Sequence, residues 1–175
     1  GYDNTIDICT GFAQGVELDV NMRGSVDFSC EPSFESSRIL ISGSGDVDLA
    51  DTGNLACTIS GSGDLKFISA KNANLTVNGS GDVSAGDIDG ICEIKINGSG
   101  DAHLGSAVGE LSCHIGGSGD VEIGMIDLKR MTVGISGSGD VIVAEGKTDS
   151  LDLKLQGSSD FRGDDITVGE LVADL

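Results

Sequence analysis

Apolar and polar residues alternate with a period of two in short segments of the chain, and these segments recur every 18 to 20 residues. Such alternation is typical of strands that bury one face. Aligning the segments yields three apolar columns, rich in the β-branched residues that suit a pleated surface. The columns are Val20, Ile39, Cys57, Leu75, Ile94, Cys113, Val133 and Leu153; Met22, Ile41, Ile59, Val77, Ile96, Ile115, Ile135 and Leu155; and Phe28, Val47, Leu65, Val83, Ala102, Val121, Val141 and Phe161.

A four-residue motif separates the second column from the third. Gly-Ser-Gly-Asp occurs at 43–46, 61–64, 79–82, 98–101, 117–120 and 137–140, and a degenerate copy, Gly-Ser-Ser-Asp, occupies 157–160. Toward the N-terminus, Asp27 lies 19 residues before Asp46, and Asp7 lies 20 before Asp27. The apolar pattern around Asp27 supports an earlier repeat there.

A repeat of this length holds two strands of about five residues plus corners, and it cannot bury its own apolar face, so it must stack on its neighbours. We therefore predict an all-β fold, a right-handed parallel β-helix with 18–20 residues per coil and eight to nine coils. The predicted domain spans 1–175: less regular coils or a cap over 1–35, the repeats over 36–163, and a partial coil over 164–175.

The glycines of the motif can be explained in two ways from the sequence. If the chain is extended there, glycine leaves room where the wall of the helix is thin; if it turns, glycine supplies backbone angles that other residues avoid. In either case the Ser and Asp side chains of the motif point outward.

Composition narrows the function classes. The formal net charge is −19, with 28 glycines, one proline and no tryptophan. Such a polyanion repels nucleic acid and anionic membrane surfaces, and few aromatic rings are present for stacking sugars or bases. No segment approaches the roughly 18 apolar residues of a transmembrane helix. No signal peptide is visible, and we expect the natural N-terminus to have been trimmed.

The string Ile-Ser-Gly-Ser-Gly-Asp-Val at 41–47 and 135–141 resembles the bacterial GIN-domain family of auto-transporter adhesin heads. The resemblance covers about residues 36 to 163. It implies a right-handed β-helix on an exported, often envelope-anchored protein, and it brings no known catalytic residues.

The motif aspartates form the first candidate site: a structural turn ladder of Asp46, Asp64, Asp82, Asp101, Asp120, Asp140 and Asp160. Carboxylates about 4.8 Å apart repel by about 0.9 kcal/mol in water-like dielectric, so something must compensate. We favour hydrogen bonds from turn N–H groups or serine hydroxyls. Calcium is the alternative, although one carboxylate per turn is few for an ion that takes six to eight oxygens.

The motif serines form a candidate outward recognition ladder of Ser44, Ser62, Ser80, Ser99, Ser118 and Ser138, with a solvated hydroxyl face as the plainer interpretation. His103 and His114 lie one coil apart on outward positions, and two histidines without a third ligand indicate zinc only weakly. Cys57, Cys92 and Cys113 are expected to be buried hydrophobes, whereas Cys9 and Cys30 are candidates for a pair.

No catalytic triad, Cys-His pair or phosphate loop can be identified, so we predict no enzyme activity, no catalytic residues, no metal site and no cofactor. The favoured function is an exported bacterial module, extracellular, envelope-bound or periplasmic. It would act as an adhesin-like binder of a carbohydrate or protein surface ligand, or as a scaffold. The alternatives are a polysaccharide-active β-helix enzyme and an intracellular bactofilin-like polymer. Open ends and flat faces would permit a homo-oligomer.

Overall fold

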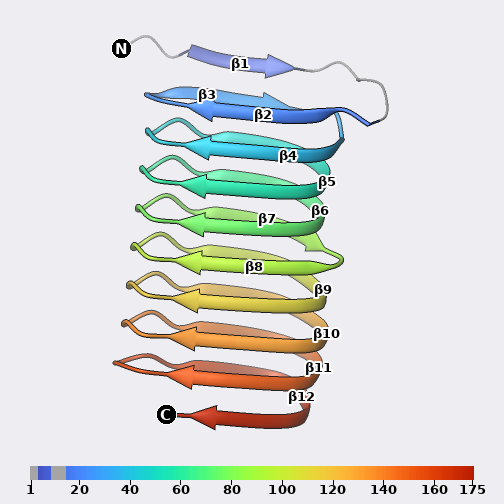
Figure 1. Cartoon of the computed structure of the whole chain (residues 1–175), viewed down its shortest axis with the longest axis vertical. Coiled ribbons are helices and arrows are strands. Elements are labelled where there is room, and N and C mark those ends of the chain that lie inside the picture. The colour runs from blue at the N-terminus through green and yellow to red at the C-terminus, as the bar shows by residue number, and fades with distance from the viewer. Residues whose placement is uncertain (1–3, 9–14) are drawn as a thin grey trace.

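The computed structural model describes residues 4–8 and 15–175. This part of the chain is a right-handed parallel β-solenoid of stacked coils (Figure 1). Within it no helix occurs, so none has the length and apolarity of a membrane span. The strands are β1 (Asn4–Ile8), β2 (Glu17–Met22), β3 (Val26–Cys30), β4 (Phe34–Ile41), β5 (Val47–Ile59), β6 (Leu65–Val77), β7 (Val83–Ile88), β8 (Ile91–Ile96), β9 (Ala102–Ile115), β10 (Val121–Ile135), β11 (Val141–Leu155) and β12 (Phe161–Asp174).

Each coil has two faces, a corner and a turn. β2, β4 and β8 lie on the near face in Figure 1, together with the second halves of the long strands; we call this the front face. β3, β7 and the first halves of the long strands form the back face. The Gly-Ser-Gly-Asp motif makes the turn from front to back, at the left edge of Figure 1, and the other corner returns the chain to the front.

The strands are longer than the two five-residue segments predicted from the alternation. β5, β6 and β9 to β12 each run through the corner for 13 to 15 residues. β5 and β6, for example, pair in parallel from Val47–Leu65 to Ile59–Val77. Two coils within residues 15–175 break into separate strands: β3 and β4 are separated by residues 31–33, and β7 and β8 by Asp89 and Gly90.

The three apolar columns form the core. Ile41, Ile59, Val77 and Ile96 are completely inaccessible to solvent. The predicted inward parity is therefore confirmed, and it persists until the last coil, where Leu155 and Phe161 are only half-buried.

The motif glycines are required by the close approach of successive coils. From Gly43 to Gly139 none of them has a positive φ; in this column only Gly24 and Gly157, near the two ends, do. A Cβ on Gly81 would overlap the carbonyl oxygen of Gly63 in the previous coil, far inside any real Cβ contact distance, and the same holds along the column. The serine between the glycines completes the stacking, because the Ser80 N–H donates to the Gly61 carbonyl at 3.0 Å.

The parallel ladder also includes the residues before 36 and after 163. β2 pairs with β4 from Glu17–Ser36 to Met22–Ile41. β12 pairs with β11 as far as Asp174. In β1 the residue opposite Asp27 is Thr5, so Asp7 lies two positions away from the aspartate column, and the suggestion that Asp7 begins this column is wrong.

Candidate functional site

The motif aspartates form a continuous hydrogen-bonded ladder between coils. The Oδ1 atom of each carboxylate accepts the backbone N–H of the aspartate in the next coil. The seven bonds, at 2.8 to 2.9 Å, run from Asp46 N to Asp27, Asp64 to Asp46, Asp82 to Asp64, Asp101 to Asp82, Asp120 to Asp101, Asp140 to Asp120 and Asp160 to Asp140. A carboxylate–amide bond is charge-assisted, so it offsets the repulsion between neighbouring carboxylates.

The ladder uses one oxygen of each carboxylate, and the side chains are exposed or half-buried. Among residues 15–175 no three His, Cys, Asp or Glu side chains gather in an arrangement that could hold a metal ion. The aspartate side chains accept hydrogen bonds from the backbone of the neighbouring coil, and this column holds successive turns in register.

The motif serines are exposed along the same turn edge. Their backbone N–H groups bind the previous coil, as in the 2.9 Å bond from Ser118 N to the Gly98 carbonyl. Their hydroxyls point outward beside the aspartate ladder. A partner at this edge would meet both hydroxyls and a row of negative charge.

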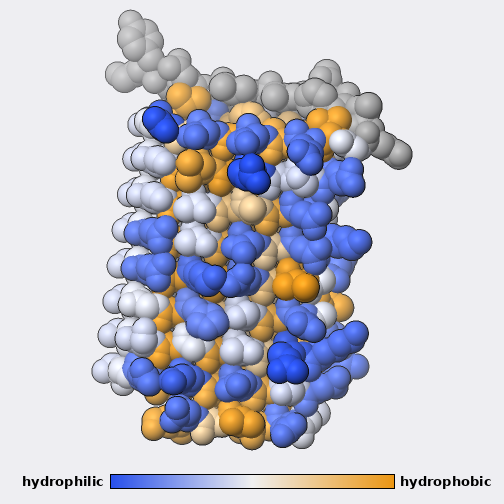
Figure 2. Space-filling view, viewed as in Figure 1, coloured by the Kyte–Doolittle hydropathy of each residue, from blue (hydrophilic) through white to orange (hydrophobic). Residues whose placement is uncertain are grey.

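The front face differs in charge from the rest of the molecule. Over residues 36–156 its outward side chains include four basic residues, Arg38, Lys95, Arg130 and Lys154, against three acidic ones, Glu93, Glu110 and Asp152. The rest of the chain, with 6 of the 10 basic and 26 of the 29 acidic residues, therefore carries the negative charge of the molecule. Figure 2 shows hydrophilic and intermediate residues over most of this face, hydrophobic residues between them, and the motif turns, which are of intermediate hydropathy, along its left margin.

Side-chain amides and hydroxyls dominate the front face. They come from Ser36, Ser42, Asn54, Thr58, Ser60, Asn72, Asn74, Thr76, Asn78, Asn97, Ser112, Thr132, Ser136, Ser150 and Gln156. Several form ladders of their own: Asn72 Nδ2 donates to Asn54 Oδ1 at 2.8 Å, and Asn97 Nδ2 donates to Asn78 Oδ1 at 2.9 Å. These bonds orient the amides at the spacing of the coils, so the face presents a regular array of donors and acceptors.

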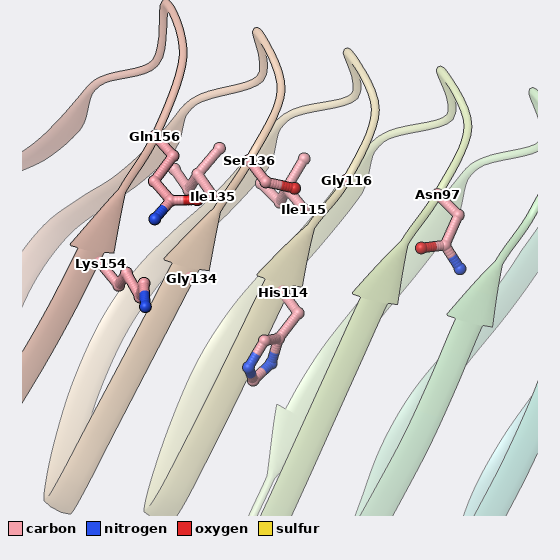
Figure 3. A pocket seen from close by; sticks show the side chains of 9 residues that line it. All are labelled: Asn97, His114, Ile115, Gly116, Gly134, Ile135, Ser136, Lys154 and Gln156. Carbon is pink, nitrogen blue, oxygen red and sulfur yellow. The ribbon is translucent and has the colours of Figure 1, made fainter.

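A shallow hollow of about 290 Å³ interrupts the front face toward its C-terminal end (Figure 3). It lies where Gly116 and Gly134 replace larger residues in the outward columns. Its lining is Asn97, His114, Ile115, Gly116, Gly134, Ile135, Ser136, Lys154 and Gln156. The phase of the repeats already assigned all of these positions except Ile115 and Ile135 to the outward side, and Gly116 and Gly134 were the signal that the sequence prediction missed.

Both histidines are exposed, as their outward parity predicts. His103 Nδ1 lies 3.2 Å from Glu122 Oε2 on the back face, whereas His114 Nδ1 lies 3.3 Å from the Ser112 hydroxyl on the front face. The structure therefore places them on opposite sides of the solenoid, so they cannot share a ligand.

Three cysteines lie in the core. Burial raises the pKa of the Cys57 and Cys92 thiols to about 12, and burial together with the neighbouring Cys92 raises that of Cys113 to about 12. The strand register displaces Cys92 from Cys113 by two residues. These thiols are protonated and inert near neutral pH. Cys30 is also buried, and Cys9, its candidate partner, lies outside the described residues.

The comparisons with known proteins give one finding. A family model described as "putative auto-transporter adhesin, head GIN domain" matches residues 16–123 and again residues 89–175. Together the two matches cover nearly all of the chain, and their overlap is natural for a protein built of similar coils. No curated protein and no solved structure matches the chain.

Proposed function

Because the chain belongs to the family of the auto-transporter adhesin head GIN domain, we propose that it is a non-enzymatic head domain of an exported bacterial protein. In this role it would bind a carbohydrate chain at the cell surface or in the periplasm. The family description supports the adhesin-like role and the surface location, and the composition of the front face supports a carbohydrate ligand.

The observation that carries the proposal is the composition of the front face. Sugar hydroxyls both donate and accept hydrogen bonds, and the amides and hydroxyls of Asn, Ser and Thr do the same. The face is flat, close to neutral and free of aromatic residues over 36–156. It therefore suits a partner that is recognised by many polar contacts without ring stacking.

The geometry of the coils also suits an extended, repetitive ligand. Outward side chains of one column recur at the strand spacing of about 4.8 Å. A polymer lying along the solenoid axis would meet a similar set of groups at every coil. Each contact would be weak, and the sum over several coils would provide the affinity.

Three substitutions in one repeat test which surface binds. Thr76→Glu adds a negative charge on the front face, Ser80→Glu adds it at the turn edge, and Ser84→Glu adds it on the back face. All three side chains are at least partly accessible, so the fold should persist, which circular dichroism would check. Binding of the labelled protein is then measured on an array of bacterial and host polysaccharides.

We expect the wild type to bind at least one polysaccharide and Thr76→Glu to weaken that binding about tenfold. Ser80→Glu and Ser84→Glu should change it less than about twofold. Loss of binding in Ser80→Glu alone would assign recognition to the serine ladder instead. No binding to any polysaccharide would contradict the carbohydrate assignment.

A further inference from the structure

At two positions of the front face, neither the backbone conformation nor the approach of a neighbouring coil requires glycine. Among the described glycines without a positive φ, Gly116 and Gly134 are the two at which an added Cβ would meet nothing closer than 3.1 Å. The nearest atom to a Cβ on Gly134 would be His114 Cδ2 at 3.1 Å, and on Gly116 it would be Asn97 Oδ1 at 3.4 Å. By contrast, the motif glycines would collide with the carbonyl of the coil beside them.

Glycine weakens a strand when no close approach requires it, and it often marks a place where a ligand comes near the backbone. Gly134 lies within β10, and Gly116 directly follows β9. The two positions are neighbours on the same face, and together they open the hollow of about 290 Å³. A larger residue at either position would fit the fold but would fill this space.

The walls of the hollow carry positive charge and polar groups. Gly134 lies between His114 and Lys154 in one outward column, so the missing side chain leaves room between an imidazole and an ammonium group (Figure 3). Asn97, Ser136 and Gln156 line the side nearer the turn. The Lys154 ammonium has one ion-pair partner, Asp174 Oδ2 at 3.9 Å, and both side chains are exposed. Such a pair is weak and exchanges readily.

We propose that this hollow is a subsite for the carboxylate of an acidic sugar residue, such as a uronic acid. The proposal rests on the glycan-binding function above and names the charged unit that the glycan carries. The Lys154 ammonium pairs with the carboxylate, the His114 ring closes the opposite wall, and the amides of Asn97 and Gln156 donate to ring hydroxyls. On a chain of net charge −19, the near-neutral front face is where an anionic sugar can approach.

The test uses tetragalacturonate and its fully methyl-esterified form, which keeps the sugar chain and lacks the charge. Both are titrated into the ¹⁵N-labelled full chain and followed by NMR, with acetate as a simple-anion comparison. The variants are Gly134→Thr, which fills the hollow, and Lys154→Gln, which removes its charge. Lys66→Gln is the control, because it removes an equal charge from the back face.

We expect tetragalacturonate to shift the amide signals of Gly116 and Gly134, and each hollow variant to weaken binding about tenfold. Lys66→Gln should bind like the wild type, and both the ester and acetate should bind at least about tenfold more weakly than tetragalacturonate. Should Gly134→Thr fail to fold, Lys154→Gln and the ester still decide the question.

Equal binding of acid and ester would overturn the carboxylate subsite, as would acetate binding as tightly as tetragalacturonate. No binding of tetragalacturonate at about 10 mM, or binding unchanged in Lys154→Gln, would also overturn it. None of these results would contradict glycan binding by the front face, since that is measured separately by Thr76→Glu on the polysaccharide array.

Discussion

Replacing one motif glycine by alanine tests the physical basis of the stacked coils. In Gly81→Ala the new methyl group would overlap the Gly63 carbonyl oxygen and come within 3.0 Å of the Ile59 Cγ2 atom. Neither neighbour can move freely, because one is backbone and the other is part of the core. The two coils must therefore separate locally.

The cost follows from the hydrogen bonds on either side of Gly81. The Ser80 N–H bond to Gly61 O, at 3.0 Å, and the Asp82 N–H bond to Asp64 Oδ1, at 2.8 Å, both cross the gap that would widen. A neutral bond contributes about 1 kcal/mol and a bond to a charged group about 1.5–3 kcal/mol. We therefore expect Gly81→Ala to lower the free energy of unfolding by about 2–4 kcal/mol.

Gly116→Ala is the matched control, because its methyl group would meet Asn97 Oδ1 at an ordinary 3.4 Å. Alanine also restricts the unfolded chain, so we expect no loss and a gain of up to about 1 kcal/mol. Urea unfolding followed by circular dichroism measures both variants, with the slope compared to confirm that the unfolding reaction is the same. Equal effects of the two substitutions would refute the reasoning from close approach.

Three further predictions concern the core, the aspartate ladder and the last motif. Ile96→Asp should destabilise the protein by several kcal/mol because it buries a charge at a fully inaccessible position, whereas Lys95→Asp, one residue away and exposed, should cost less than about 1 kcal/mol; thermal melting compares them. Asp101→Ala should cost about 1–2 kcal/mol because the Asp120 N–H loses its acceptor, while Asp101→Asn keeps an oxygen there and should be near neutral. Calorimetric titration should detect no micromolar calcium site in the wild type, and micromolar binding that Asp101→Asn abolishes would contradict this role for the ladder. Ser159→Gly should increase the free energy of unfolding by about 1 kcal/mol and raise the melting temperature, because the Ser159 hydroxyl is buried without a partner in the described structure. An unchanged or lower melting temperature would show that the hydroxyl finds a partner.

Burial could be predicted from the sequence because it depends on local alternation. Ile59 and Val77 belong to the same column as soon as the period is known, and both are fully buried. The continuous strands could not be predicted in the same way, because pairing through the corner depends on how neighbouring coils align. Thr52 and Ala70, for example, pair within the corner and are both buried.

The site was predictable in its residues and less so in its contacts. The aspartate ladder follows from the motif, but its acceptor–donor pairs join residues 18 to 20 apart, such as Asp82 and Asp101, and depend on the vertical spacing of the coils. The role of Gly81 has the same origin, since its close neighbour is Gly63 of another coil. The hollow at Gly116 and Gly134 could have been predicted from the repeat alignment, because both glycines leave gaps in columns of outward side chains.

The role of the motif as a device that joins coils can be measured directly in solution. In a uniformly ¹³C,¹⁵N-labelled chain, a scalar coupling through a hydrogen bond connects the donor nitrogen to the carbon that bears the acceptor oxygen. The structure predicts a cross-peak between the Asp101 amide nitrogen and the Asp82 side-chain carboxyl carbon, and another between Asp120 and Asp101. Cross-peaks from these carboxylates to amides of their own coil, or carboxylate signals that shift only on addition of calcium, would contradict the inter-coil ladder.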